Sequence, residues 1–117
     1  MEDCIFCKIT SGAISSDIVY QDEHFVAFRD IHPQAPVHVL IVPRRHWSDL
    51  LAMAADTAGQ GVAKYLPAAV AGTAKACGVE VSGFRLISNY GKDGGQSVPH
   101  VHFHLLGGTP LGDKIRG

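Results

Sequence analysis

The feature that most constrains this fold is the run His-Val-His-Phe-His-Leu-Leu at residues 100–106. Three histidines alternate there with apolar residues. Successive side chains of a β-strand point to opposite faces, so the run predicts a strand with three imidazoles on one face and an apolar opposite face. A row of imidazoles is costly to bury for packing alone. The run therefore indicates a functional site.

The length and composition indicate one globular domain spanning residues 1–117. Hydrophobic residues make up 46% of the chain and charged residues 18%, as in ordinary soluble domains. The formal net charge of −1 gives no overall attraction to nucleic acid or to a membrane surface, so neither is an expected partner. No apolar run approaches the roughly 18 residues needed to cross a bilayer.

The N-terminal residues Met1-Glu2-Asp3-Cys4 are acidic and do not have the pattern of a secretory signal. We therefore expect a cytoplasmic protein, in which thiols stay reduced. Its three cysteines are then better interpreted as thiols or metal ligands than as a disulfide framework. Cys77, at the end of a predicted helix, is expected to pack in the core.

The apolar pattern predicts an α+β fold with an antiparallel sheet of about five strands. Strands are expected at residues 18–21, 25–28, 38–42, 85–89 and 101–106. One main helix is expected over residues 60–77, where Pro67 should kink it or divide it, and a short helix over 49–55. The strands flank the main helix without βαβ alternation, which favours the antiparallel arrangement.

The histidine run follows a glycine-rich loop, Gly-Gly-Gln-Ser-Val-Pro at residues 94–99. Such a loop lets backbone N–H groups approach an anion, and Gln96 and Ser97 add side-chain donors. An anion cradle beside imidazoles favours phosphoryl chemistry, because imidazole can attack phosphorus and form a covalent intermediate. The alternatives are a metal-chelating His-x-His pair, a merely polar strand face and a plain hairpin turn.

Together these motifs resemble the histidine triad family, whose signature is His-φ-His-φ-His-φ-φ with φ apolar. The resemblance covers most of the chain. It rests on Asn89, the Gly-Gly-Gln-Ser segment and the histidine run, and it extends to Ile-Phe-Cys-Lys-Ile at 5–9, Phe-Arg-Asp-Ile at 28–31, Pro-Gln-Ala-Pro at 33–36, His-Val-Leu-Ile-Val-Pro at 38–43 and Gly-Gly at 107–108. The approach to the run and the final Gly-Gly are most similar to the nucleotide-binding, Hint-like branch.

The resemblance implies a homodimer in which two five-stranded sheets join into one. It also implies binding of purine nucleoside phosphates, such as adenosine or guanosine monophosphate conjugates, with cleavage at the α-phosphate through a nucleotidyl-histidine intermediate. The implied catalytic residues are His102 as nucleophile, His104 on the phosphate oxygens, Ser97 near the leaving group and His38 as a supporting histidine. The implied substrate-binding residues are Asp30, Ile31, Asn89, Gly95, Gln96, Ser97, His102 and His104. Asp30 would hold the ribose, whose two hydroxyls suit a carboxylate.

Cys4 and Cys7 form a Cys-x-x-Cys pair that by itself fits a redox site, half a zinc site or two buried thiols. The strand–helix context of a redox pair is missing. Zinc needs four tetrahedral ligands. The resemblance implies that His46 and His100 complete a structural zinc site, so that no catalytic metal is required.

Three other functions stay open on the sequence: a dinucleoside polyphosphate hydrolase, a hydrolase with catalytic zinc on the three histidines, and a nucleotide-binding scaffold with vestigial activity. The C-terminal tail lacks the Trp-rich sequence of some family members, which leaves the leaving-group preference open. Arg44 and Arg45 are interpreted as a solvated pair, with contact to a leaving-group phosphate as the alternative. Trp47 is interpreted as a core or subunit-contact residue.

Overall fold

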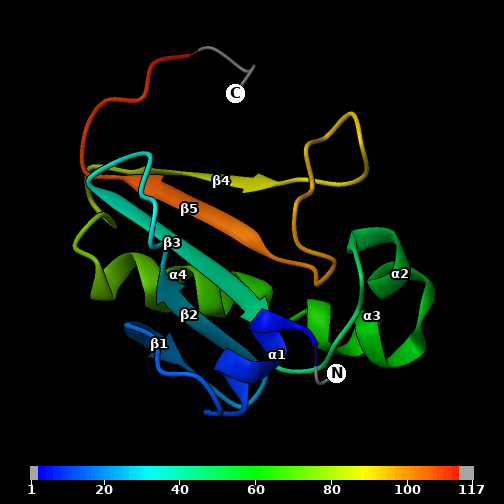
Figure 1. Cartoon of the computed structure of the whole chain (residues 1–117). Helices are drawn as coiled ribbons and strands as arrows, with labels where there is room; N and C mark the ends of the chain where they lie inside the picture. Colours follow the sequence, from blue (N-terminus) through cyan, green and yellow to red (C-terminus); the bar gives the residue numbers. More distant parts are fainter. Residues whose placement is uncertain (1–2, 114–117) are drawn as a thin grey trace.

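The computed structural model describes residues 3–113 as a five-stranded antiparallel sheet with helices on both faces (Figure 1). The strands are β1 (Ile18–Gln21), β2 (Phe25–Arg29), β3 (Val37–Pro43), β4 (Phe84–Ser88) and β5 (Phe103–Gly107), in the order β1-β2-β3-β5-β4. The predicted α+β class and antiparallel sheet are confirmed. The order places β3 beside β5, which brings residues 38–41 next to residues 103–106.

Alternation along the central strands divides the apolar core into two layers. The layer toward α4 (Leu66–Ala76) contains Phe25, Ala27, Val39, Ile41, Phe103 and Leu105. The layer toward α1 (Ile5–Thr10) contains Val26, Phe28, Leu40 and Val42. Successive side chains of these strands point to opposite faces, and both sets are apolar and buried. Each face of the sheet therefore needs a covering helix.

The helices on the α4 side agree with the predicted short helix and with a division of the predicted main helix. The chain forms α2 (Leu50–Ala55), α3 (Thr57–Ala63) and α4; the division falls between α3 and α4, and Pro67 lies in the first turn of α4. Proline is tolerated there because its missing N–H needs no intrahelical partner. Gly72 lets Tyr20 of β1 lie against α4, since a Cβ at this position would fall 2.2 Å from the tyrosine ring. Within residues 3–113, no helix is both long enough and apolar enough to span a membrane.

Helix α1 was not predicted by the sequence pattern. It has six residues, which is too short for an apolar period to be recognised. Its N-cap is Cys4, whose sulfur accepts a hydrogen bond from the backbone N–H of Cys7 at 3.4 Å. The helix lies across the sheet in front of β3 and presents Phe6 and Ile9 to the core (Figure 1).

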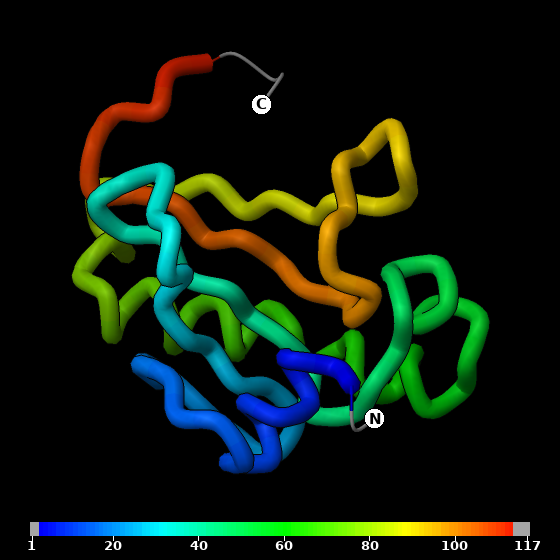
Figure 2. Tube along the Cα trace, viewed as in Figure 1, coloured from blue at the N-terminus to red at the C-terminus, as the bar shows by residue number. Residues whose placement is uncertain are grey.

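Strand β5 begins later than the sequence predicts. His100 and His102 precede it, and only His104 lies within the strand. The N–H of Val101 donates to the carbonyl of Trp47 at 2.8 Å, so this residue bonds outside the β5 ladder. The chain from residue 89 to 99 leaves β4 and returns to the start of β5 at the end of the sheet nearest α2 (Figure 2).

Candidate active site and metal site

His102 is held by the residue that precedes it by two positions. Its Nδ1 atom lies 2.7 Å from the carbonyl oxygen of His100. A carbonyl can only accept, so Nδ1 carries the proton and donates. In the neutral imidazole, Nε2 then holds the lone pair. The local backbone thus fixes His102 in the tautomer that a nucleophile requires.

His104 and His38 form a directed chain of hydrogen bonds. The backbone N–H of Gln34 donates to Nδ1 of His38 at 3.0 Å, so the proton of the neutral His38 ring is on Nε2. That atom lies 3.0 Å from Nδ1 of His104 and 3.4 Å from a carboxylate oxygen of Asp30. His104 therefore accepts on Nδ1 and keeps a proton on Nε2, which leaves it a donor for an anionic group.

Burial keeps His104 neutral. Removal from water lowers the pKa of His104 from 6.5 to about 4, and the nearby His102 and His38 add to the effect. The carboxylate of Asp30 acts in the opposite direction. At neutral pH His104 therefore contributes a hydrogen-bond donor rather than a positive charge.

The glycine-rich loop is fixed by its own amide side chains. The amide of Asn89 donates to the carbonyl of Gly94 at 2.7 Å, and the amide of Gln96 donates to Ser48 and Val98 carbonyls at 2.8 and 3.0 Å. Gly95 has a φ of +75°, a conformation that favours glycine. These bonds hold the loop beside the start of β5.

The remaining predicted substrate residues are the more exposed ones. The side chain of Ser97 is exposed, and Ile31 is 85% exposed. Asp30 is half-buried, and its second oxygen accepts from the N–H of His32 at 2.8 Å.

The four predicted metal ligands meet at one point. The cysteine–histidine cluster, meaning Cys4, Cys7, His46 and His100, has all four ligand atoms within 4.8 Å of one another. The sulfur-to-Nδ1 distances are 3.3 to 3.6 Å, and the two Nδ1 atoms are 3.1 Å apart. A tetrahedral zinc ion would separate sulfur and nitrogen by about 3.6 Å and two nitrogens by about 3.3 Å, from its usual bond lengths. The donor set and its spacing therefore fit zinc.

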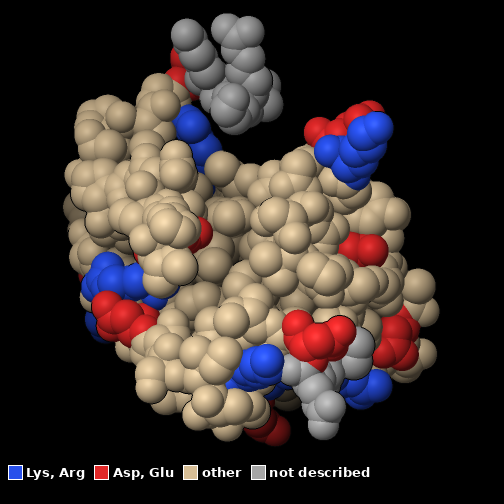
Figure 3. Space-filling model, viewed as in Figure 1, with Lys and Arg blue, Asp and Glu red and all other residues tan. Residues whose placement is uncertain are grey.

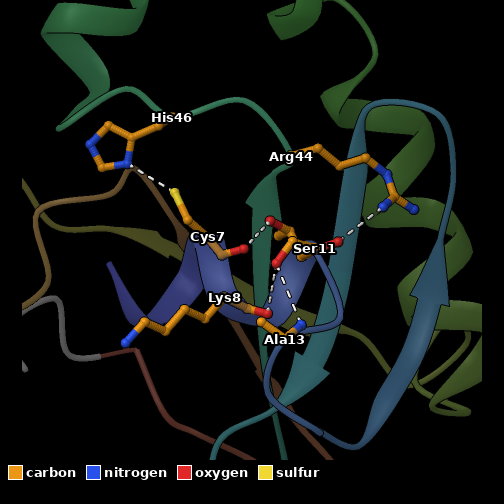
Figure 4. A pocket seen from close by; sticks show the side chains of 7 residues that line it. Cys7, Lys8, Ser11, Ala13, Arg44 and His46 are labelled. Carbon is orange, nitrogen blue, oxygen red and sulfur yellow. Dashed lines mark hydrogen bonds between the residues drawn. The ribbon is translucent and has the colours of Figure 1, made fainter. Parts of the chain in front are cut away.

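His100 is already oriented for ligation. Its Nε2 lies 3.0 Å from the carbonyl oxygen of Pro43 and so carries the proton, which leaves the Nδ1 lone pair facing the cysteines. Burial lowers the pKa of His100 to about 4, and it also lowers the pKa of His46. Burial raises the pKa of the Cys7 thiol. Figure 4 shows Cys7 and His46 at the wall of a surface pocket, whereas Cys4 and His100 are buried.

A second group, Asp30, His38 and His104, also brings ligand atoms within 4.8 Å. It does not fit a metal as well, because the Gln34 N–H occupies Nδ1 of His38 and leaves the proton on the nitrogen that would have to ligate. Among the described residues, His100, His102 and His104 do not bring one ring nitrogen each to a common point. This arrangement argues against a catalytic zinc on all three.

Sequence reasoning misinterpreted Arg44 and missed Phe6 and Gln34. Arg44 is half-buried rather than fully solvated: its guanidinium donates to the Asp22 carbonyl at 2.8 Å and to the Gln21 side chain at 3.0 Å. Phe6 packs against His102, and Gln34 acts through its backbone. No sequence signal reports a backbone donor, but the apolar Ile-Phe preceding Cys7 was a signal for Phe6.

Other expectations at lesser positions hold. Trp47 is buried in the core toward α4. Cys77 is partly buried and packs against the same core. Arg45 is exposed, as expected of a solvated cation, with its guanidinium 5.4 Å from the Trp47 ring centre.

Comparison with known proteins decides the family. A family model of the HIT domain matches residues 11–111. The chain belongs to the histidine triad (HIT) family. It is 46% identical over 114 residues to a purine nucleoside phosphoramidase of Escherichia coli K12, which covers 97% of this chain and 94% of the relative. The expectation of a histidine triad enzyme is confirmed, since the chain is a HIT family hydrolase.

Solved HIT structures have the same fold. A histidine triad protein from Clostridium difficile superimposes with a TM-score of 0.90 at 39% identity, covering 97% of both chains. A HIT family hydrolase from Clostridium thermocellum gives a TM-score of 0.91 at 40% identity, covering 99% of both. Similarity over nearly the full length extends the HIT assignment to the fold.

Proposed function

We propose that this HIT hydrolase cleaves purine nucleoside phosphoramidates at the α-phosphate, through a nucleotidyl-histidine intermediate on His102. The observation that carries the proposal is the hydrogen bond from Nδ1 of His102 to the carbonyl of His100. It leaves the Nε2 lone pair free to attack phosphorus. Residues 1–117 act as a single HIT domain in this proposal.

In the first step, Nε2 of His102 forms a bond to phosphorus while the phosphorus–nitrogen bond of the substrate breaks. The amine leaves with the electron pair of that bond and takes up a proton from solvent. In the second step, water attacks phosphorus and gives up a proton to solvent, the electron pair of the bond to His102 returns to Nε2, and the nucleoside monophosphate is released. Two moderate displacements replace one difficult one.

The Nε2–H of His104 donates a hydrogen bond to a phosphate oxygen in both steps. Charge develops on these oxygens at each displacement, and a preoriented donor stabilises it. The Gln34–His38 chain supports the proposal because it sets which nitrogen of His104 bears the proton. His38 is thus the supporting histidine.

The other substrate contacts keep their predicted roles. Asn89, Gly95 and Gln96 lie beside the phosphate in this proposal, and Ser97 lies near the leaving group. The backbone N–H groups of Gly95 and Gln96 donate to the carbonyls of Lys92 and Gly91 at 3.1 Å, so these two are not the free backbone donors that the sequence suggested. Asp30 and Ile31 hold the ribose and the base. The exposure of Ile31 and Ser97 supports this, because both are free to contact a substrate.

Charge favours phosphoramidates over dinucleoside polyphosphates. The proposed phosphate contacts include no Lys or Arg, whereas Asp30 contributes a carboxylate. Most charged side chains on this face of the molecule lie around its rim (Figure 3). A substrate with one phosphate charge is therefore better suited than a polyanion. The relative named purine nucleoside phosphoramidase supports the same choice.

We further propose that the cysteine–histidine cluster holds a structural zinc ion. A bound zinc ion would cross-link α1 to the segment before β5 and would take no part in the cleavage. The fit of the donor distances to a tetrahedron supports it.

A homodimer is the proposed assembly. Strand β4 is at the edge of the sheet, with Phe84 and Leu86 41% and 40% exposed. An unpaired edge carrying exposed apolar residues is suited to pairing with a second copy. Antiparallel pairing of the two β4 strands would join the two sheets into one.

The test compares turnover of adenosine phosphoramidate by the wild type and His102→Ala. We expect loss of turnover in the variant with adenosine monophosphate binding retained, and faster wild-type cleavage of the phosphoramidate than of diadenosine tetraphosphate. Near-native turnover by His102→Ala would disprove the nucleophile. Absent wild-type turnover with intact nucleotide binding would favour the scaffold function instead.

A further inference from the structure

Helix α1 connects the metal site with the nucleophile. It carries Cys4 at its N-cap and Cys7 in its first turn, and Phe6 lies between them. The Phe6 ring meets the His102 ring edge-on, with centroids 5.1 Å apart and planes at 80°. It meets the ring of His100 in the same manner at 5.9 Å. Phe6 is only 6% exposed, so its position is set by packing.

His100 makes the same connection through its backbone. Its ring nitrogen Nδ1 faces the cysteines, and its carbonyl accepts the proton of His102 Nδ1 at 2.7 Å. Thus two of the groups that contact the His102 ring, Phe6 and the His100 carbonyl, belong to elements joined at the cysteine–histidine cluster. A third, the ring of His104 on β5, lies edge-on to His102 with centroids 5.1 Å apart. The supporting chain to His104 uses other elements, β3 and the loop before it.

We infer that Phe6 is a positioning residue for His102, and that the cysteine–histidine cluster maintains this contact by fixing α1 and His100. The inference rests on the proposed nucleophilic role of His102. A single hydrogen bond at Nδ1 fixes the tautomer but lets the imidazole pivot about that bond. Phe6 and the ring of His104, each with its centroid 5.1 Å from that of His102, restrict this freedom, and Phe6 is the neighbour that α1 supplies.

Positioning of this kind affects the chemical step more than substrate binding. Displacement of a reacting atom by about 1 Å can cost about a hundredfold in rate. His104 and the loop hold the phosphate independently, so binding should survive a change at Phe6. A fall in kcat with little change in KM therefore distinguishes a positioning role from a general loss of structure.

The test uses the zinc-loaded protein with Phe6→Leu and, as a control, Val42→Ala. Val42 lies in the same apolar layer but on β3, so its truncation also leaves a cavity there. We expect Phe6→Leu to lower kcat about tenfold or more with KM changed less than about twofold, and Val42→Ala to leave kcat near the wild-type value. Phe6→Met, whose flexible side chain can adapt to the space that the ring leaves, serves if the leucine variant does not fold.

A second readout does not depend on activity. Nitrogen NMR of the His102 ring reports which nitrogen bears the proton and how fast that proton exchanges with solvent. We expect one tautomer with slow exchange in the zinc-loaded wild type, and faster exchange in Phe6→Leu and after zinc is removed by a chelator.

Unchanged kcat and unchanged exchange in Phe6→Leu would overturn the inference, as would equal losses in Val42→Ala. If the wild type hydrolyses no phosphoramidate, the proposed function fails. In that case the NMR comparison still decides whether Phe6 and the cluster restrain His102.

Discussion

Nε2 of His38 lies 3.0 Å from Nδ1 of His104, although 66 positions separate the two residues in the chain. The contact crosses from β3 to β5, where Leu40 pairs with His104 in the antiparallel register. Gln34 fixes the proton of His38 on Nε2, and His38 in turn fixes that of His104, whose Nε2–H is left as a hydrogen-bond donor.

Removal of His38 should weaken the enzyme without unfolding it. His38→Ala frees Nδ1 of His104, so the ring loses its preferred tautomer. We expect kcat/KM for adenosine phosphoramidate to fall about tenfold, the equivalent of one hydrogen bond of about 1.4 kcal/mol. Gln34→Ala is the control, because it keeps the backbone N–H that donates to His38. An equal effect in Gln34→Ala would contradict the role of the backbone donor.

Stability should fall in acid because of His104. Its pKa is about 4 when folded and near 6.5 when unfolded, so between these values the unfolded chain binds a proton that the folded chain does not. The stabilisation is complete above about pH 6.5 and is lost as the pH falls toward 4. Urea unfolding from pH 8 to 4 measures this. His104→Asn should show a shallower decline than the wild type, and identical pH profiles would contradict the assignment.

Zinc should be found at about one ion per chain in protein purified without chelator. His46→Ala and Cys7→Ala should each lower the content and the melting temperature, because a tetrahedral site loses a ligand. Elemental analysis and thermal unfolding are the measurements. Cys77→Ala is the control, since this cysteine packs beside the α4 core and not in the cluster. A metal-free preparation that resists zinc addition would exclude the site.

Replacement of Arg44 should lower the free energy of unfolding far more than replacement of Arg45. Arg44→Ala removes hydrogen bonds that tie the segment after β3 to residues 21 and 22, at a cost of about 2 kcal/mol. The exposed Arg45, 3.8 Å from Asp56, should cost less than about 0.5 kcal/mol when replaced by alanine. Denaturant unfolding of both variants makes the comparison. Equal free energies of unfolding would show that Arg44 is solvated after all.

The proposed dimer should depend on the edge of β4. Leu86→Lys places a charge on its exposed apolar face and should convert the protein to a monomer in light-scattering measurements. Val81→Lys adds the same charge at a side chain that is 95% exposed and precedes the strand, so it should leave the assembly unchanged. A wild-type monomer at micromolar concentration would refute the proposed dimer.

Local sequence patterns predicted much of this fold. The strand period of β2, the apolar β-branched run of β3, the division of the main helix near Pro67 and the glycine-rich approach to β5 each depend on interactions between near neighbours, and these follow from residue type. The short helix α1 lacked a recognisable period. The strand start at Phe103 depended on a bond between Val101 and Trp47, which no local pattern encodes.

The sequence by itself determined which residues were available: a histidine run, a Cys-x-x-Cys pair and a flexible donor loop. Resemblance to a family then gave them expected roles. Only the tertiary structure decided the protonation pattern, because the His100 carbonyl, the Gln34 N–H and the Pro43 carbonyl select the tautomer of each ring. The partners of His102 and His38 are close in sequence, whereas Pro43 lies 57 positions from His100. In each case the folded backbone decides which carbonyl or N–H is directed at the ring, and residue type alone does not encode that direction.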